Sequence, residues 1–303
     1  MDLMRPEQRN AAIGAGLAAG AILCFSIRPI LIKLAYFYMS DPVTLLALRM
    51  GFALPFFLWP AYVLARRPGQ VPIAPKDAVG IVILGFFGYY LGSFFDFLGL
   101  QYVSAGLGRL ILFLYPTIVV LLSVLFLGKH ATKRELLALA ISYGGLALAL
   151  SPAFAGHNKN FWLGAGFIFS GGVVYSIYLV GGTQIVRRTG SLRFSAYATS
   201  LACAPAIGQF LILRPLSALN LPWMVYFLSL VIATLCTAIP VFMTAEALRR
   251  IGANRVAMIG ALGPVSTIFW GWAGLDEAMS LTQLAGVALV LGGVLMVSLR
   301  PAH

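Results

Sequence analysis

Charged side chains are scarce in this chain, and acidic ones are the scarcest. Only 10% of its 303 residues are charged, with 9 Asp and Glu against 21 Lys and Arg, whereas 60% are hydrophobic. Soluble domains contain about 25% charged residues, so this composition excludes a soluble globule and predicts an integral membrane protein. Because a spanning helix takes about 20 apolar residues, the chain has room for about ten such helices.

Histidine and cysteine are also rare, which limits the available chemistry. The three histidines lie in connectors or at the terminus: His130, His157 and His303. The three cysteines lie inside apolar runs, at spacings unlike a metal or disulfide framework: Cys24, Cys203 and Cys236. The sequence therefore lacks the residues for a buried Ser–His pair or a His-ligated metal site. It also contains no Walker A pattern. We expect no enzymatic activity, no cofactor and no metal.

The basic residues recur between apolar runs instead of forming one patch, so the net charge of +12 does not indicate nucleic-acid binding. Lys and Arg at such positions set membrane topology and contact anionic lipid head groups. The runs are continuously apolar, which favours helices over alternating strands, and the first is too long for a signal peptide. The ten predicted spans cover residues 11–34, 43–65, 77–98, 103–125, 132–151, 161–184, 194–213, 223–246, 252–273 and 280–299.

The distribution of basic residues predicts the orientation of these spans. If the N-terminus lies in the cytoplasm, most of the 21 Lys and Arg fall in inner segments, as is typical of membrane proteins. The outer segments then hold only Lys33, Lys159 and Arg214. With nine or eleven spans, segments rich in Lys and Arg would no longer alternate with segments poor in them. We therefore predict that both termini are cytoplasmic.

The segment from Leu100 to Leu150 occurs twice. At an offset of 148 residues, Pro116 falls on Pro264, and the pair Gly144–Gly145 falls on Gly292–Gly293. A shared proline and a shared glycine pair in one frame indicate an internal duplication. The first spans of the two halves also align, at an offset of 150 residues. The predicted five-helix repeats cover residues 1–155 and 156–303.

The two copies differ in the charge of one connector. The first copy carries Lys129, Lys133 and Arg134 there, whereas the second carries Asp276 and Glu277 and no basic residue. Basic connectors mark the cytoplasmic side, so the two connectors should lie on opposite sides of the membrane. The sequence thus predicts an all-α protein whose two repeats are inverted around a central cavity, as in many transporters.

Four charged residues lie inside the predicted spans, in the outer half of the membrane: Arg28, Arg49, Asp96 and Arg109. Such residues are rare and are functional candidates by default. In one interpretation, the arginines hold a substrate carboxylate bidentately, while Asp96 pairs with an arginine or meets an ammonium group. In the other, Asp96 neutralises one arginine and the others extend to the outer interface.

The second half lacks this cluster, since Arg28 aligns with Tyr178 and Arg109 with Ala257. It offers aromatic side chains that could face those of the first half. The candidates are Tyr175, Tyr178 and Trp270 in the second half and Tyr89, Tyr90, Phe94 and Tyr115 in the first. A pocket with a basic end and an aromatic wall suits an amino acid, especially a large apolar one. The alternative for each aromatic is contact with lipid or the membrane interface.

Several prolines fall inside predicted spans, where each removes a backbone hydrogen bond and kinks its helix. Pro116 and Pro264, which the repeat relates, are candidate hinges for a conformational change. The alternative is a static kink at each position.

The second copy carries the segments Ala253–Ala257, Leu262–Val265 and Asp276–Glu277, followed by Gly286 and Gly292–Gly293. With ten spans in two inverted halves, the chain resembles the ten-helix drug/metabolite transporter superfamily, and within it the bacterial exporters of aromatic amino acids. The first copy departs from the usual pattern, with Gly128–Lys129 where an acid is common. The resemblance implies a bacterial inner-membrane location and a central cavity lined by spans 1–4 and 6–9.

We therefore expect a membrane carrier that exports amino acids, aromatic or otherwise apolar, by alternating access. Its partners would be the small-molecule substrate and the lipid bilayer, with a homo-oligomer left open. Proton-coupled carriers usually need an acid near the middle of the bilayer, and none is present, so we expect facilitated or exchange transport. The alternatives are a carrier of organic anions or phosphorylated metabolites, and a membrane protein that does not transport.

Overall fold

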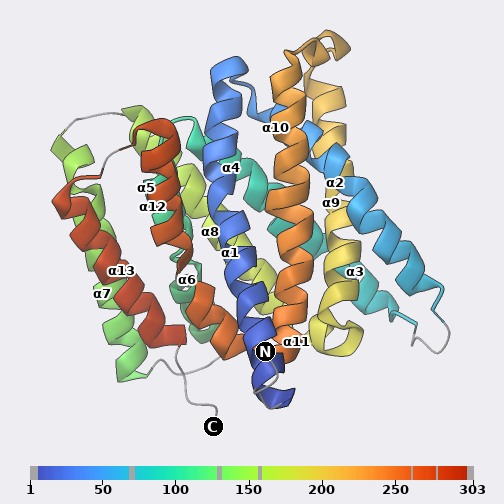
Figure 1. Cartoon of the computed structure of the whole chain (residues 1–303), viewed down its shortest axis with the longest axis horizontal. Helices are drawn as coiled ribbons and strands as arrows, with labels where there is room; N and C mark the ends of the chain where they lie inside the picture. The colour runs from blue at the N-terminus through green and yellow to red at the C-terminus, as the bar shows by residue number, and fades with distance from the viewer. Residues whose placement is uncertain are drawn as a thin grey trace.

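The computed structural model describes residues 6–67, 72–127, 132–155, 159–260, 262–277 and 279–298. All regular structure within these ranges is helical (Figure 1). The elements are α1 (Pro6–Tyr38), α2 (Pro42–Ala65), α3 (Pro75–Gly85), η1 (Phe86–Leu91), α4 (Gly92–Leu100), α5 (Ala105–Leu112), α6 (Tyr115–Leu127), α7 (Lys133–Ala155), α8 (Lys159–Thr189), α9 (Ser191–Leu213), η2 (Leu216–Leu219), α10 (Trp223–Ala233), η3 (Thr234–Ala238), α11 (Ile239–Gly260), α12 (Leu262–Leu275) and α13 (Leu281–Ser298).

In the described part of the chain, 7 helical stretches are long and apolar enough to cross a membrane. They are Gln8–Tyr38, Pro42–Ala65, Pro75–Leu100, Ala105–Leu122, Lys159–Gly182, Ser191–Leu213 and Trp223–Ile251. Two shorter apolar helices, Leu136–Pro152 and Leu281–Met296, lie within α7 and α13. The expectation of an all-helical membrane protein is confirmed, while the number of ten spans remains a prediction.

One expected break in the chain is absent. The sequence predicted a connector between residues 246 and 252, but α11 continues as a helix from Ile239 to Gly260. Glu246 accepts hydrogen bonds from Arg249 and Arg250, both at 2.6 Å to its Oε1. Pairs with this spacing stabilise a helix, so the charged segment prolongs the helix beyond the apolar run.

The candidate hinges Pro116 and Pro264 both lie near the start of a described helical segment. α5 ends at Leu112, α6 begins at Tyr115, and Pro116 is the second residue of α6. Pro264 is the third residue of α12. Proline fits the first turn of a helix because the amide hydrogens there have no partner within the helix. The interruption at residues 113–114 lies within one apolar stretch, Ala105–Leu122, directly before Pro116. This agrees with the expected kink at Pro116, while the role of both prolines as hinges remains a prediction.

The π-helical segments η1 and η3 occupy equivalent places in the two halves. η1 begins at Phe86 and η3 at Thr234, which are 148 residues apart. A π-helical turn holds more residues than an α-helical turn and is often found at functional sites. Each segment lies within a long apolar helical stretch, so the two halves share this irregularity as well as the sequence pattern.

Helices α7 and α13 pack along one another through their paired glycines (Figure 1). A Cβ added to Gly145 would lie 2.8 Å from the carbonyl oxygen of Gly286, and one added to Gly293 would lie 2.7 Å from that of Ala138. The second contact is the first shifted by 148 residues with the partners exchanged, as a two-fold relation requires. Glycine at both positions lets the two backbones approach closely.

We expect Gly145→Ala to lower the thermal stability of the protein in detergent, because its methyl group would enter the backbone of α13. Overpacking of this kind costs about 1–3 kcal/mol. The matched control is Gly144→Ala, since no described atom lies within 4 Å of a Cβ at Gly144. The control should retain its melting temperature because Ala favours helix over Gly. Equal shifts for the two variants would contradict this account of the packing.

A second pair of reciprocal contacts joins the first helix of each half to the other half. Ser26 Oγ in α1 donates to the carbonyl oxygen of Gly263, and Ser176 Oγ in α8 donates to that of Tyr115, both at 3.1 Å. The two serines are 150 residues apart, and the two acceptors are 148 apart. Each first helix therefore packs on the opposite half, which brings residues of both halves together in the interior.

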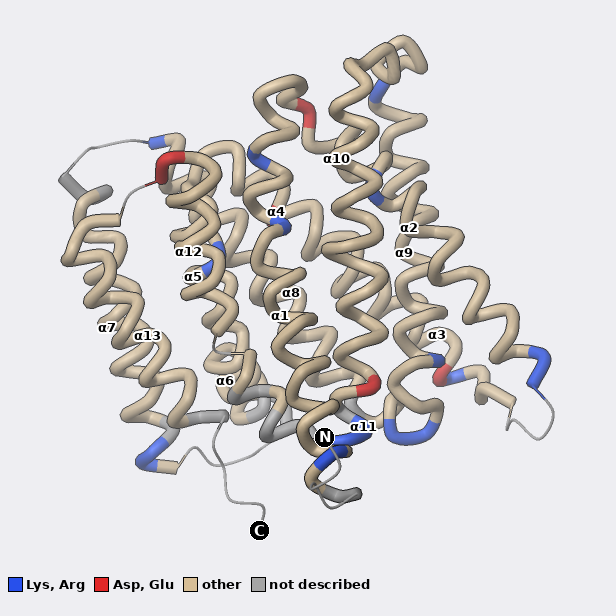
Figure 2. The backbone as a smooth tube through the Cα atoms, in the orientation of Figure 1, with Lys and Arg blue, Asp and Glu red and all other residues tan. Residues whose placement is uncertain are grey.

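The basic residues gather at the end of the bundle where α1 begins and α13 ends (Figure 2). α7 also begins at this end, whereas α12 ends at the opposite one (Figure 1). Lys133 and Arg134, the first residues of α7, and Asp276, which follows α12, therefore lie at opposite ends of the bundle. The predicted inversion of the two halves requires this arrangement.

Candidate functional site

An ion pair between α1 and α4 is the centre of the candidate site. Arg28 Nη2 lies 2.7 Å from Asp96 Oδ2, and their side chains are 14% and 5% exposed. The expectation that Asp96 pairs with an arginine is met by Arg28. A charge-assisted bond of this length is strong, and because both groups are largely buried, each depends on the other for its partner.

Arg49 of α2 lies near this pair but has no acidic partner among the described residues. Its Nε donates to Thr237 Oγ1 at 3.3 Å, its guanidinium lies 5.6 Å from the Phe97 ring centroid, and its buried Nη1 has no partner there. The residue is only 2% exposed, so the interpretation in which Arg49 extends to the outer interface is wrong. The sequence reading missed Thr237 and Phe97 because neither carries a charge.

Arg109 of α5 reaches from the first half toward the second. A Cβ added to Gly263 of α12 would lie 3.4 Å from Arg109 Nη2, so the guanidinium lies close to this glycine. The buried Nε of Arg109 has no partner among the atoms that the structure describes. Gly263 also accepts a hydrogen bond from Ser26, two residues before Arg28 in α1. Arg109 thus has unused hydrogen-bonding capacity close to the helix that carries Arg28.

Four tyrosines from both halves form a contiguous row, here called the tyrosine row: Tyr115, Tyr175, Tyr178 and Tyr89. Their successive ring centroids lie 5.3, 5.7 and 5.2 Å apart. Tyr178 also donates its hydroxyl to that of Tyr89 at 3.1 Å. Tyr175 and Tyr178 share one face of α8 because they are three residues apart. Tyr115 packs in the same hydrophobic cluster as Leu110 and Ile111, which follow Arg109 in α5, so the row begins near the helix that carries this arginine.

Three predicted aromatic candidates lie outside the tyrosine row. Tyr90 and Phe94 stack on each other at 6.3 Å and pack in a hydrophobic cluster with residues of α1, α2 and α9. Tyr89 of the row packs against the same cluster, so Tyr90 and Phe94 border the row through it. Trp270 pairs with Phe269 at 5.3 Å, and the part of all three residues in a site remains a prediction.

Glu277, which follows α12, joins the two halves at the end opposite the start of α1. Its Oε1 lies 3.2 Å from Lys33 Nζ of α1, and its Oε2 accepts a hydrogen bond from the backbone N–H of Ala105 at 2.7 Å. The latter is the first residue of α5, where amide hydrogens lack helical partners and attract anions. We call this arrangement the Glu277 bridge. It connects the helix of Arg28 with the short helix of Arg109, and the sequence reading missed it.

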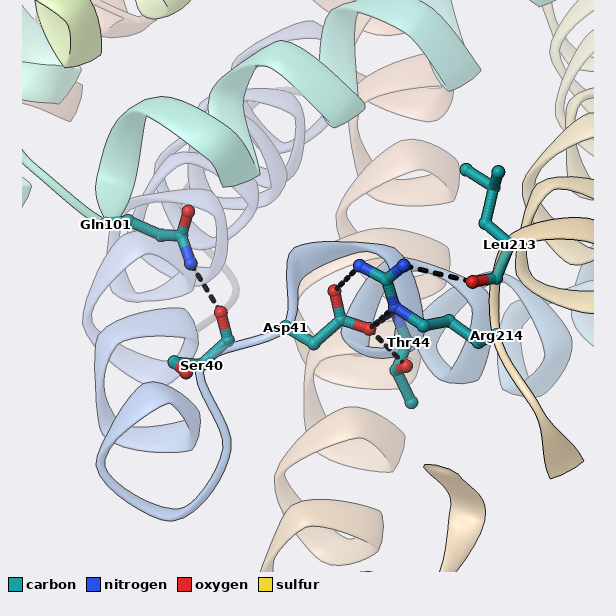
Figure 3. Close-up of polar contacts among 6 residues, drawn as sticks. All are labelled: Ser40, Asp41, Thr44, Gln101, Leu213 and Arg214. Atoms are coloured by element: carbon teal, nitrogen blue, oxygen red, sulfur yellow. Dashed lines mark hydrogen bonds and ion pairs between the residues drawn. The ribbon is translucent and has the colours of Figure 1, made fainter. Parts of the chain in front are cut away.

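A second polar cluster lies between the start of α2 and the end of α9 (Figure 3). Arg214 donates through Nε and Nη2 to the two carboxylate oxygens of Asp41, at 2.9 and 2.8 Å. Asp41 also caps α2 by accepting from Thr44 N at 3.2 Å. Nearby, Gln101 Nε2 donates to the carbonyl oxygen of Ser40. Burial opposes ionisation of Asp41, but the bonds from Arg214 and Thr44 outweigh it and lower the pKa of Asp41.

We expect Asp41→Asn to lower the melting temperature at pH 7 and to lose this effect in acid. A lowered pKa in the folded state stabilises the fold above the unfolded pKa of about 3.9. The contribution disappears as the pH falls through the lower, folded-state pKa. Thermal unfolding in detergent between about pH 6 and pH 3 would follow it. The control is Asp276→Asn at an exposed site; if both variants kept the wild-type profile, Asp41 would not stabilise the fold in this way.

Among the described residues, no three His, Cys, Asp or Glu gather into a group that could hold a metal ion. The groups able to contact a ligand are therefore the arginines, Asp96 and the tyrosine row. Guanidinium groups bind carboxylates and phosphates, and tyrosines offer apolar rings with a polar hydroxyl. Long apolar helices that enclose such groups define a polytopic membrane transport protein.

The family of this transporter follows from its comparison with known proteins. The model of the EamA-like transporter family matches residues 12–151 and again residues 162–299, and the chain belongs to this family. It is 33% identical over 303 residues to the uncharacterized transporter YcbK of Bacillus subtilis, covering 97% of this chain and 95% of that protein. It is 26% identical over 260 residues to an uncharacterized transporter of Archaeoglobus fulgidus, covering 85% and 88%.

A solved crystal structure of a protein shares the fold. It superposes with a TM-score of 0.61 at 17% sequence identity, covering 94% of this chain and 97% of that chain. The expectation of a drug/metabolite transporter is thus confirmed at the level of the family. The relatives' names specify no substrate.

Proposed function

We propose that this transporter exports amino acids with aromatic or other apolar side chains by alternating access. The observation that carries the proposal is the buried Arg109, whose Nε has no partner among the described atoms, in a helix whose residues Leu110 and Ile111 share a hydrophobic cluster with Tyr115 of the tyrosine row. Arg109 would hold the substrate carboxylate, and the row would contact the apolar side chain. The Arg28–Asp96 pair would lie near the α-ammonium group. These groups come from both halves, so movement of one half against the other would change their access.

The proposal includes ten spans in two inverted repeats, 1–155 and 156–303, with Pro116 and Pro264 as hinges. The double match of the family model and the reciprocal contacts of α7 with α13 support the repeats. The gathering of basic residues at one end of the bundle supports cytoplasmic termini in a bacterial inner membrane (Figure 2).

Cysteine labelling tests this topology. In a variant with its three native cysteines replaced, a membrane-impermeant maleimide should label Ser280→Cys in intact cells but Lys133→Cys only after the cells are opened. These positions flank the acidic and the basic connector. Labelling of both from the same side would exclude the inverted arrangement.

Flux in proteoliposomes tests the substrate. Phenylalanine should be transported faster into vesicles that contain the protein than into empty vesicles. An absence of phenylalanine flux would contradict the proposed export of aromatic amino acids. The second candidate is an organic anion or phosphorylated metabolite, and the excess of arginine over acid in the interior favours it. Flux of a sugar phosphate in the same vesicles would support this alternative.

A further inference from the structure

We infer that the species this transporter carries has a net negative charge, and that organic dianions with an aromatic group suit the site best. The inference rests on the proposed transport by alternating access and, of the two proposed substrates, selects the organic anion in place of the zwitterionic amino acid. It starts from a charge imbalance: three arginines, Arg28, Arg49 and Arg109, share one described acid, Asp96, in the membrane interior. Guanidinium groups remain protonated in proteins. The cluster therefore carries an excess of two positive charges.

These residues form one electrostatic group. Arg28 and Asp96 are in direct contact at 2.7 Å. Arg49 lies 5.6 Å from the ring centroid of Phe97, the residue after Asp96. Arg109 lies close to Gly263, whose carbonyl oxygen accepts a hydrogen bond from Ser26, two residues before Arg28. Asp96 is thus attracted by three cations, and Arg28 repels two of them. One carboxylate cannot neutralise the group.

The other described acids cannot supply the missing charge because they are engaged elsewhere or lie in solvent. Four of them form ion pairs with other basic residues: Asp41 with Arg214, Asp77 with Arg188, Glu246 with Arg249 and Arg250, and Glu277 with Lys33. Asp276 is exposed. Within the part of the chain that the structure describes, the excess charge in the interior has no protein counter-ion.

Three buried nitrogens point to the same conclusion. Arg28 Nε, Arg49 Nη1 and Arg109 Nε are all enclosed and lack hydrogen-bond partners among the described atoms. Buried donors on charged groups are costly when left unpaired. An anion would satisfy both the charge and the donors, whereas a neutral molecule would satisfy the donors alone.

The net charge of the substrate decides how much of the imbalance remains. A zwitterionic amino acid adds no net charge and brings an ammonium group close to three arginines. A monoanion leaves one excess charge, and a dianion leaves none. With the tyrosine row beside Arg109, the best match is an aromatic acid that lacks an ammonium group and carries two carboxylates.

Transport of an anion would also explain how export proceeds without a proton-coupling acid, since Asp96 is occupied by Arg28. Bacterial membranes are negative inside, so the potential drives an anion outward. A potential of about 59 mV shifts the equilibrium distribution of a monoanion tenfold, and about 30 mV does so for a dianion. The carrier would act as a uniporter driven by the membrane potential.

The test compares three molecules with the same benzyl group in proteoliposomes of the full-length protein. Phenylalanine has no net charge, 3-phenyllactate has one negative charge, and benzylmalonate has two. Valinomycin and potassium gradients set the potential. We expect benzylmalonate to move fastest, with a distribution that shifts about tenfold for each 30 mV.

Transport of phenylalanine alone, independent of potential, would overturn the inference and leave the proposed function standing. An absence of flux for all three would overturn both. Arg49→Met should reduce the ratio of benzylmalonate to 3-phenyllactate flux at least tenfold, whereas Arg49→Lys, which keeps the charge, should preserve the ratio. Equal loss of both fluxes in Arg49→Met would assign Arg49 a structural role and count against the inference.

Discussion

Arg109→Ala should abolish transport while the protein still inserts and folds. Arg109 has no acidic contact partner in the described structure, so its removal leaves no buried charge unpaired and lowers the positive excess of the interior. Substrate, in contrast, would lose a charged hydrogen-bonding partner. Such bonds contribute about 1.5–3 kcal/mol, which corresponds to a loss of affinity of roughly ten- to a hundredfold. Flux in proteoliposomes measures the loss.

Two variants separate the roles of charge and geometry at this position. Arg109→Lys keeps the charge but not the planar fork that matches a carboxylate, and should retain part of the activity. Arg67→Ala removes an exposed arginine beyond the end of α2 and should transport normally. Gel filtration in detergent and the melting temperature should be unchanged for all three. Full activity of Arg109→Ala would show that Arg109 does not contact the substrate.

Asp96→Ala, unlike Arg109→Ala, should severely reduce the stability of the protein. It would leave Arg28 without its partner at 2.7 Å in a largely buried position. Breaking a buried pair from one side costs about 3–5 kcal/mol, a large share of the stability of a typical protein. We therefore expect a low yield of folded protein and a strongly reduced melting temperature in detergent.

The double variant Arg28→Met with Asp96→Leu should recover much of that stability, because apolar residues of similar volume can replace a buried ion pair at little cost. Asp77→Ala is the control, since Arg188, its partner, is 59% exposed and remains hydrated when the pair is lost. If Asp96→Ala has the same melting temperature as the wild type, the ion pair does not stabilise the packing of α1 on α4.

Helix positions could be predicted well where an apolar run ends at a clear stop. The span expected at residues 194–213 appears as α9, Ser191–Leu213, and that at 43–65 as α2, Pro42–Ala65. The prediction failed where hydropathy was the wrong guide. Charged residues are typical of connectors, but ion pairs between residues three and four apart also stabilise a helix. α11 therefore continues past Glu246, which pairs with Arg249 and Arg250.

The candidate site was predicted in part. The pairing of Asp96 with an arginine and the gathering of four tyrosines agree with the sequence analysis. Tyr89 and Tyr90 separate because adjacent residues of a helix point in different directions, and the π-helical turn of η1 shifts the faces again. The partners Thr237 and Gly263 could not be anticipated, since neutral residues gain significance only from a long-range contact.

The shared irregular turn bears on the proposed duplication of the two halves. Tyr89 in η1 and Thr237 in η3 are 148 residues apart, so the duplication that we propose would have copied the extra residue of the π-helical turn together with the sequence. The two positions accept hydrogen bonds from different donors, from the Tyr178 hydroxyl in one half and from Arg49 Nε in the other. The same backbone distortion thus serves two chemical uses, and the side chains alone make the two halves of the proposed binding region unlike.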